Sequence, residues 1–277
     1  TLRLADNDDM TEKAHELARF FATVHHWARQ GQRVNAGELT QFGARGLFGQ
    51  SNNGLLYTTA RASAGIVLPE QALAAVLVDS AETRLAKACG VHRVLTRLAE
   101  QQRHFRSPIW SDLKRPSVAS PRESESFLAK VHRARTGAAS FVVEGKRVRI
   151  LLRREVRADL RSSGASLAPG APFALFVAPA ASANAVLVWH PGQKEPSAIR
   201  EDGSDGSRLS GSCLLIAPGG HKDQARVIED GYSLLFSHES WALVSAALGA
   251  SKPLKLPMAD EIVLELEWPS EDLTDRR

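Results

Sequence analysis

The spacing of apolar residues changes along this chain, and the change constrains the fold more than any other feature. In residues 10–30 apolar side chains recur at intervals of three and four, which is typical of an amphipathic helix. In residues 146–153 they alternate with polar side chains, which is typical of a strand. We therefore predict an α+β protein, with a helical N-terminal region containing a helix-turn-helix-like hairpin and a mainly β C-terminal domain.

The first predicted helix has a wide apolar face. Asp9 and Glu12 have the form of a capping box at its start, and Gly31 ends it. The apolar face comprises Leu17, Phe20, Phe21, Val24, Trp27 and Ala28. Histidines on this helix lack the spacing and the third ligand that a metal site needs, so we predict no metal there.

Residues 80–103 predict a helical hairpin that resembles a helix-turn-helix. Ser80 is placed to cap a first helix over 81–88, Gly90 allows the bend, and Val91 fills the angle before a second helix over 92–103. In this arrangement four polar residues lie at the exposed start of the second helix, where they could contact bases and phosphates. They are His92, Arg93, Thr96 and Arg97. A purely structural hairpin is the competing interpretation.

Two other N-terminal stretches lack a functional motif. The glycine-rich residues 35–54 match neither dinucleotide-binding nor Walker spacing, so they predict a structured connector. The alanine-rich residues 70–78 predict a buried helix.

Positive charge is concentrated in the middle of the chain. Residues 93–161 hold 17 Lys/Arg against 7 Asp/Glu, a net charge of +10, whereas residues 1–92 are neutral and residues 162–277 carry −6. Such a block favours a polyanion-binding face, because phosphate neutralisation releases counterions. The alternative is that these cations pair with the acidic C-terminal part.

Proline, serine and charged residues gather in residues 106–125, which we interpret as a basic linker between domains at 1–105 and 126–277. Phe105 and Trp110 are the large aromatic residues of this stretch. They could stack on an unpaired base, or they could simply anchor the linker to a domain. The candidate phosphate contacts here are Arg103, Arg106, Lys114 and Arg115.

A hairpin predicted over residues 139–144 and 146–153 provides the second candidate surface. Its second strand is apolar on one face and cationic on the other. The candidate residues are Lys146, Arg147, Arg149, Arg153 and Arg154, with Arg157 beyond them. A strand at a sheet edge that is protected by charge predicts the same alternation.

Catalytic motifs are weak throughout. Cys213 could pair with His190, His221 or His238 in a hydrolase, but no local signature supports that arrangement. Asp202 and Asp205 lack the glutamate that would complete a calcium loop. We expect no cofactor and no catalytic residue.

The function favoured by these patterns is non-catalytic binding of DNA or RNA. The protein would act as a regulator or as one subunit of a larger nucleoprotein complex, such as a bacterial RNA-guided defence complex, with other protein subunits as partners. A protein-interaction subunit without nucleic-acid contact is the alternative. No run of residues is long and apolar enough to span a membrane, and the start lacks the apolar region of a secretory signal, so a cytoplasmic location without a membrane partner is expected.

Overall fold

A computed structural model describes residues 2–3, 9–43, 46–48, 52–61, 65–69, 71–153, 155–156, 158, 171–206, 208–258 and 262–268. The chain divides into two compact units, residues 1–120 and 121–277. Both units combine helices with strands, so the mixed α+β class predicted from the sequence is confirmed.

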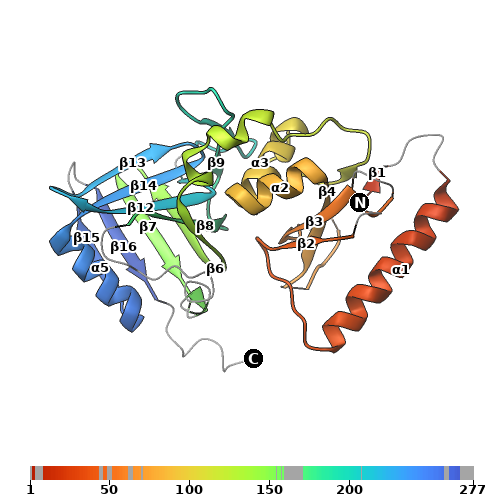
Figure 1. The fold of residues 1–277 in the computed structure, drawn as a ribbon, viewed down its shortest axis with the longest axis horizontal. Coiled ribbons are helices and arrows are strands. Elements are labelled where there is room, and N and C mark those ends of the chain that lie inside the picture. The colour runs from red at the N-terminus through yellow and green to blue at the C-terminus, as the bar shows by residue number, and fades with distance from the viewer. Residues whose placement is uncertain are drawn as a thin grey trace. The chain divides into compact units, whose positions relative to one another are not determined.

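The N-terminal unit contains a small antiparallel sheet in the order β2-β3-β4, with three helices (Figure 1). A short parallel pair, β1 with β5, forms a separate ladder whose strand β5 contacts β4. The helices are α1 (Met10–Arg29), α2 (Ser80–Cys89) and α3 (Val91–Gln101), and the strands are β1 (Leu2–Arg3), β2 (Leu39–Gln41), β3 (Asn52–Thr59), β4 (Leu73–Asp79) and β5 (Ser111–Asp112).

The two faces of this sheet contact different helices. Leu55, Tyr57 and Leu77 form a buried cluster against which Leu17 and Phe20 of α1 pack. Side chains alternate across a strand, so Leu56 lies on the other face, together with Gly54, whose Cα approaches Thr83 of α2. The helix predicted over residues 10–30 is thus confirmed, with Asp9 accepting hydrogen bonds from Thr11 N and Glu12 N.

The prediction of a helix over residues 70–78 is wrong. This alanine-rich segment forms β4, which pairs with β3 so that Tyr57 lies opposite Ala75 and Leu55 opposite Leu77. Alanine favours a helix intrinsically, but burial of Val76 and Val78 between layers outweighs a preference of less than about 1 kcal/mol per residue.

Most of the segment interpreted as a linker belongs to the N-terminal unit. Ser111 Oγ accepts a hydrogen bond from Leu77 N at 3.0 Å, and Gln102 Nε2 donates to Trp110 O at 2.8 Å. The boundary between the two compact units falls after Ser120, inside the predicted segment 106–125. Hydrogen bonds to the Ser111 hydroxyl and to the backbone carbonyl of Trp110 therefore tie this segment to its own unit.

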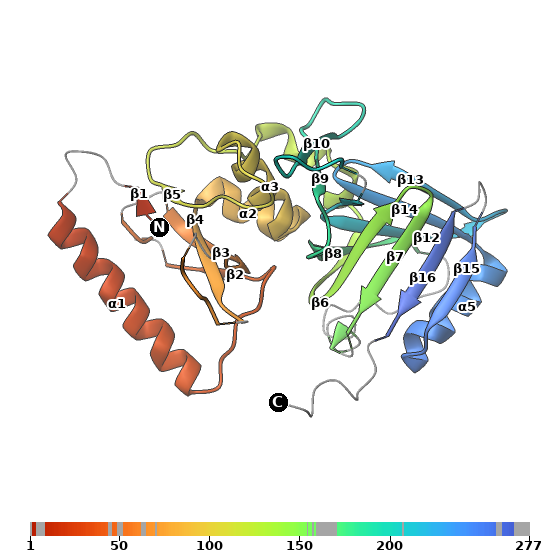
Figure 2. The same cartoon turned by 180° about the vertical axis from the view of Figure 1, so that it is seen from behind.

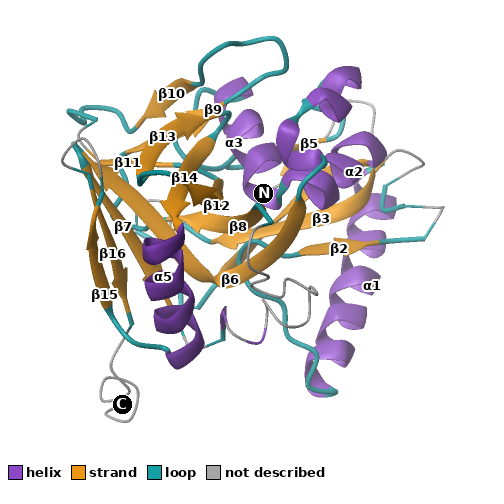
Figure 3. Cartoon of the chain, turned by 60° about the vertical axis from the view of Figure 1, so that its left-hand side comes forward, coloured by secondary structure: helices purple, strands orange, loops and turns teal. Residues whose placement is uncertain are grey.

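The C-terminal unit is built on a sheet of eleven described strands (Figures 2 and 3). Its main path runs β10-β9-β11-β6-β8-β12-β14-β13, and β7, β16 and β15 branch from β6. The strands are β6 (His132–Glu144), β7 (Arg147–Leu152), β8 (Phe173–Pro179), β9 (Ala185–Val188), β10 (Ser197–Arg200), β11 (Arg208–Ser210), β12 (Cys213–Gly220), β13 (Gln224–Ile228), β14 (Gly231–Ser237), β15 (Leu254–Pro257) and β16 (Val263–Glu267). Two short 3₁₀ turns, η1 (Pro121–Glu125) and η2 (Phe127–Ala129), precede them.

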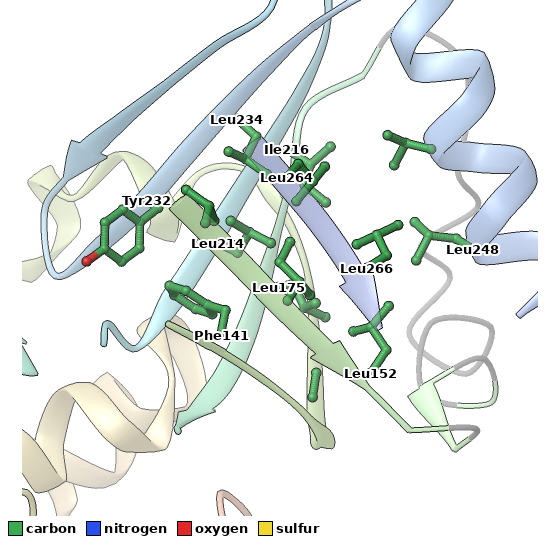
Figure 4. Packing of buried hydrophobic residues seen from close by; sticks show 14 of the residues in the cluster. Phe141, Leu152, Leu175, Leu214, Ile216, Tyr232, Leu234, Leu248, Leu264 and Leu266 are labelled. Atoms are coloured by element: carbon green, nitrogen blue, oxygen red, sulfur yellow. The ribbon is translucent and has the colours of Figure 1, made fainter. Parts of the chain in front are cut away.

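Helix α5 (His238–Ala250) covers the core of this unit. Trp241, Val244 and Leu248 on α5 share one buried cluster with Phe173 of β8 and Leu266 of β16. Of these residues, Leu248 and Leu266 are labelled in Figure 4. The β-hairpin predicted over residues 139–144 and 146–153 is present, as β6 paired with β7. Among the described helices, none combines the length and apolarity needed to cross a membrane.

Candidate nucleic-acid interface

The predicted helical hairpin is present, with boundaries shifted by one or two residues. Asp79, not Ser80, caps α2: its side chain accepts from Glu82 N at 2.8 Å, and Glu82 Oε2 accepts from Asp79 N at 3.1 Å. Gly90 has a φ of 99° at the bend, a value that L side chains rarely adopt. The local geometry is a capped helical hairpin, and recognition of DNA by it is not shown.

The expected exposure of the second helix is wrong. Side chains from Val91 to Ala99 are buried, and the exposed fractions of Arg93 and Arg97 are 0% and 1%. His92 and Thr96 are also buried, and Thr96 Oγ1 donates to His92 O within the helix. One cause is that the chain folds back over α3, so that Arg97 Nη1 donates to Val118 O at 3.4 Å. These four side chains do not form the open reading face predicted from the sequence.

His92 occupies an apolar position in this hairpin. Burial lowers the pKa of its imidazole to about 4, so the ring is neutral at pH 7. Its Nε2 atom is buried without a hydrogen-bond partner among the described residues. A Cβ at Gly37 would lie 3.2 Å from that nitrogen, which shows how closely the turn before β2 covers the ring.

Arg115 is held by a buried carboxylate. Its two terminal nitrogens donate to the two oxygens of Glu82, at 2.5 and 2.6 Å, and Glu82 Oε1 also accepts from Val118 N at 2.9 Å. The side chain of Glu82 is fully buried and that of Arg115 is 11% exposed. The pair fixes the segment after β5 to the start of α2, which is a structural role that the sequence analysis did not assign to either residue.

The cations of β7 face carboxylates of the C-terminal strand. β7 and β16 are parallel neighbours, and their register places Arg147 opposite Val263 and Arg149 opposite Glu265. Arg147 pairs with Glu265, whose carboxyl has its pKa lowered by this guanidinium, and Arg149 pairs with Glu267 at 3.3 Å and Glu144 at 3.8 Å. Lys255 of β15 also contacts Glu265, at 3.4 Å. We call this set the β7–β16 ion-pair ladder. Its existence supports the interpretation that part of the +10 block pairs with the acidic C-terminal part.

Other predicted cations lie on the surface of their units. Arg103, Lys114, Lys146 and Arg153 are exposed, and Arg106 is half-buried. Arg154 and Arg157 lie outside the described residues.

Arg61, which was not among the residues predicted to contact phosphate, lies beside the same aromatic ring as Arg106. The guanidinium carbons of Arg61 and Arg106 lie 5.6 and 5.1 Å from the centre of the Phe105 ring. Phe105 itself is only 8% exposed, so cations rather than a nucleobase cover it. Arg61 follows β3 and is 44 positions away in the sequence, so no local pattern could have linked it to this loop.

The hydrolase alternative gains no support from the surroundings of Cys213. Cys213 is fully buried in β12, and its thiol donates to Asp230 Oδ1 at 3.7 Å. Burial and an adjacent carboxylate both disfavour the thiolate that a nucleophile requires. Among the described residues, no group of three or more His, Cys, Asp or Glu side chains is placed to hold a metal ion.

The core of the C-terminal unit contains a small void of about 20 Å³. Figure 4 shows several of the leucines that line it. Apolar side chains line it, including Leu175, Leu214, Leu248 and Leu266. A void of this size has about the volume of one water but offers no polar partner, so it is a packing defect rather than a substrate site.

Searches against protein-family models and against curated proteins found no match to this chain.

Proposed function

We propose that this protein is a non-catalytic nucleic-acid-binding subunit, and that its phosphate contacts come from Arg61 and Arg106, which meet at the Phe105 ring, together with Arg103 of the same loop as Arg106. We call these three residues the arginine cluster. The observation that carries the proposal is the approach of two guanidinium groups from separate segments to one Phe105 ring. Planar guanidinium groups suit phosphate oxygens, and release of counterions from the nucleic acid favours the contact.

The loop that carries two of these arginines has an unusual backbone. Arg103 and Arg106 have φ values of 52° and 69°, in the left-handed region that non-glycine residues seldom occupy. Such conformations cost on the order of 1–3 kcal/mol and are concentrated at ligand-binding sites. At Arg103 this conformation is the ordinary end of α3, a Schellman motif in which Arg103 N donates to Glu100 O and His104 N donates to Ala99 O. Only Arg106 is therefore held in the left-handed region without such a helix end.

Exposed apolar side chains support the second half of the proposal, that the protein is a subunit of a larger assembly. In the N-terminal unit Val67 is 96% exposed, Met10 65% and Phe21 55%. Of these, Met10 and Phe21 lie on one helix, α1, and contiguous exposed apolar side chains are a feature of surfaces that are covered in a complex.

The test is the dependence of nucleic-acid affinity on salt, measured for duplex DNA and for single-stranded RNA. A variant with Arg61→Gln, Arg103→Gln and Arg106→Gln loses three cations, so we expect the slope of log affinity against log salt to fall by roughly 2–3. The matched control carries Lys146→Gln, Arg149→Gln and Arg153→Gln on the other candidate surface and should keep the slope of the wild type.

Two results would overturn the proposal. If the wild type shows no salt-dependent affinity for either nucleic acid, the protein is not a phosphate binder. If the control variant loses the slope and the arginine-cluster variant keeps it, the hairpin of β6 and β7 is the binding surface.

A further inference from the structure

The loop after α3, residues 102–110, is closed by one of its own side chains. The amide of Gln102 bridges the far end of the loop, because its Oε1 accepts from Ile109 N at 3.1 Å and its Nε2 donates to Trp110 O at 2.8 Å. The loop carries two members of the arginine cluster. These hydrogen bonds therefore fix the backbone on which those two arginines stand.

The imidazole of His104 belongs to the same loop and has a defined tautomer. Its Nδ1 lies 3.0 Å from Ser107 O, and a carbonyl oxygen can only accept, so Nδ1 carries a proton and donates. In the neutral ring Nε2 is then an acceptor, and in the protonated ring it is a second donor. His104 is half-buried and stands between Arg103 and Arg106 in the sequence. Its Nε2 thus adds a proton acceptor to a loop whose arginines only donate.

The two segments that supply the arginine cluster contain no acidic residue. Residues 54–69 and residues 101–111 include neither Asp nor Glu. The strand β7 is the opposite case, because Arg147 and Arg149 pair with carboxylates of β16 in the ion-pair ladder. The positive charge of the arginine cluster is therefore not offset by acids of its own segments, which favours an anion with more than one charge.

Charge and donor number distinguish two kinds of phosphate in a nucleic acid. An internal phosphodiester carries a single negative charge, whereas a terminal phosphate monoester carries about −1.5 to −2 at pH 7 and offers three acceptor oxygens. The guanidinium carbons of Arg61 and Arg106 lie 5.6 and 5.1 Å from the centre of one ring, so their donors gather over a small area. Such an arrangement suits one multiply charged group better than it suits a row of phosphates along a groove.

The proton of the monoester also matches His104. The second ionisation of a phosphate monoester has a pKa of about 6, so one proton is available to be shared between a phosphate oxygen and Nε2 near neutral pH. When the proton is on the phosphate, P–OH donates to Nε2, and when it is on the ring, Nε2 donates to the dianion. An internal phosphodiester has no such proton, so a neutral His104 would place its lone pair against a phosphate oxygen.

We propose that the arginine cluster and His104 together bind the terminal phosphate monoester of a nucleic-acid strand. The three arginines donate to the phosphate oxygens, and Nε2 of His104 shares the remaining proton. This inference rests on the proposed nucleic-acid binding and narrows it to the end of a strand.

Fluorescence anisotropy of the full chain with short single-stranded DNA and RNA of one sequence tests the proposal. The strands carry a 5′-phosphate, a 3′-phosphate or hydroxyl groups at both ends, and the fluorophore is attached to an internal base so that neither end is blocked. We expect one of the phosphorylated strands to bind about 10-fold more tightly than the hydroxyl strand, because charge-assisted hydrogen bonds replace neutral ones.

Single substitutions test which residues recognise the end. Arg61→Gln and, in a separate chain, His104→Asn should each reduce the preference to less than about 3-fold. Asn places an amide nitrogen where Nδ1 lies, so it keeps the donor for Ser107 O and removes Nε2. The matched control is Arg153→Gln, which removes one exposed arginine of the other unit and should leave the preference unchanged. Circular dichroism establishes that each variant is folded.

Three results would overturn the inference. Equal affinity for phosphorylated and hydroxyl strands, with salt-dependent binding retained, excludes an end-binding site and leaves the proposed nucleic-acid binding in place. A preference that persists in both Arg61→Gln and His104→Asn assigns the terminal phosphate to another surface. A chain that binds none of the strands at any salt concentration contradicts the proposed function and this inference together.

Discussion

Two ion-pair systems among the described residues consist of arginines and glutamates but differ in their exposure to solvent. Glu82 and Arg115 form a bidentate pair with almost no solvent contact, whereas the β7–β16 ion-pair ladder lies at the surface, with Arg147 49% and Glu267 47% exposed. Both systems neutralise arginines of residues 93–161, the segment with a net charge of +10. Arg115 belongs to the buried pair, and Arg147 and Arg149 belong to the ladder. Charge along a chain is therefore a poor measure of available surface charge, because local carboxylates and burial decide which cations reach solvent.

Removing the carboxylate of the buried pair gives the largest expected effect. Glu82→Gln leaves Arg115 charged in a mostly dry site, and it also weakens the bond to Val118 N. We expect the free energy of unfolding of the N-terminal unit to fall by roughly 3–5 kcal/mol. Chemical denaturation followed by fluorescence measures this change, and a loss below about 1 kcal/mol would show that water reaches the pair freely.

Protonation of His92 gives the next largest expected effect. The imidazole is buried as a neutral ring, whereas Glu82 and Arg115 are buried as an ion pair. The pKa of this imidazole is about 4 in the folded protein and 6.5 in the unfolded reference. Below pH 6.5 the unfolded chain takes up a proton at this ring, whereas the folded protein does so only near pH 4. The free energy of unfolding therefore has its full value above pH 6.5 and decreases as the pH falls from 6.5 toward 4. The loss amounts to about 3 kcal/mol at the acid end. Comparing the pH dependence of unfolding for the wild type and His92→Gln isolates it, and equal slopes would contradict the burial of a neutral ring.

Removing a carboxylate of the exposed ladder gives the smallest effect. Glu267→Gln is the same type of substitution as Glu82→Gln, but we expect it to lower the free energy of unfolding of the C-terminal unit by less than about 1 kcal/mol. Added salt should reduce this difference further, since screening weakens exposed pairs. A loss as large as that for Glu82→Gln would remove the distinction between the two systems.

The predictions that depend on residues near one another in the sequence were the more successful ones. The helix with Asp9 as its cap, the hairpin bent at Gly90 and the β-hairpin before Leu152 all follow from local spacing and turn chemistry. Residues 70–78 were predicted wrongly because alanine content describes an isolated helix, while pairing with β3 and burial between two layers decided the strand.

The candidate site was harder to predict because exposure is a property of the assembled fold. Arg93 and Arg97 have the charge and helical position of residues that contact nucleic acid, but the chain near Val118 lies over their helix. Arg61 shares an aromatic ring with Arg106, and only the fold brings these residues together. Phosphate binding itself stays a prediction.

The sequence by itself determined the mixed class and the main helices, because these depend on periodicity and on caps within a few residues. Only the tertiary structure decided which cations are buried, which are paired across β7 and β16, and which arginines meet at Phe105. The physical reason is that solvation and Coulomb energies depend on distances between residues far apart in the chain, and the order of residues does not specify those distances.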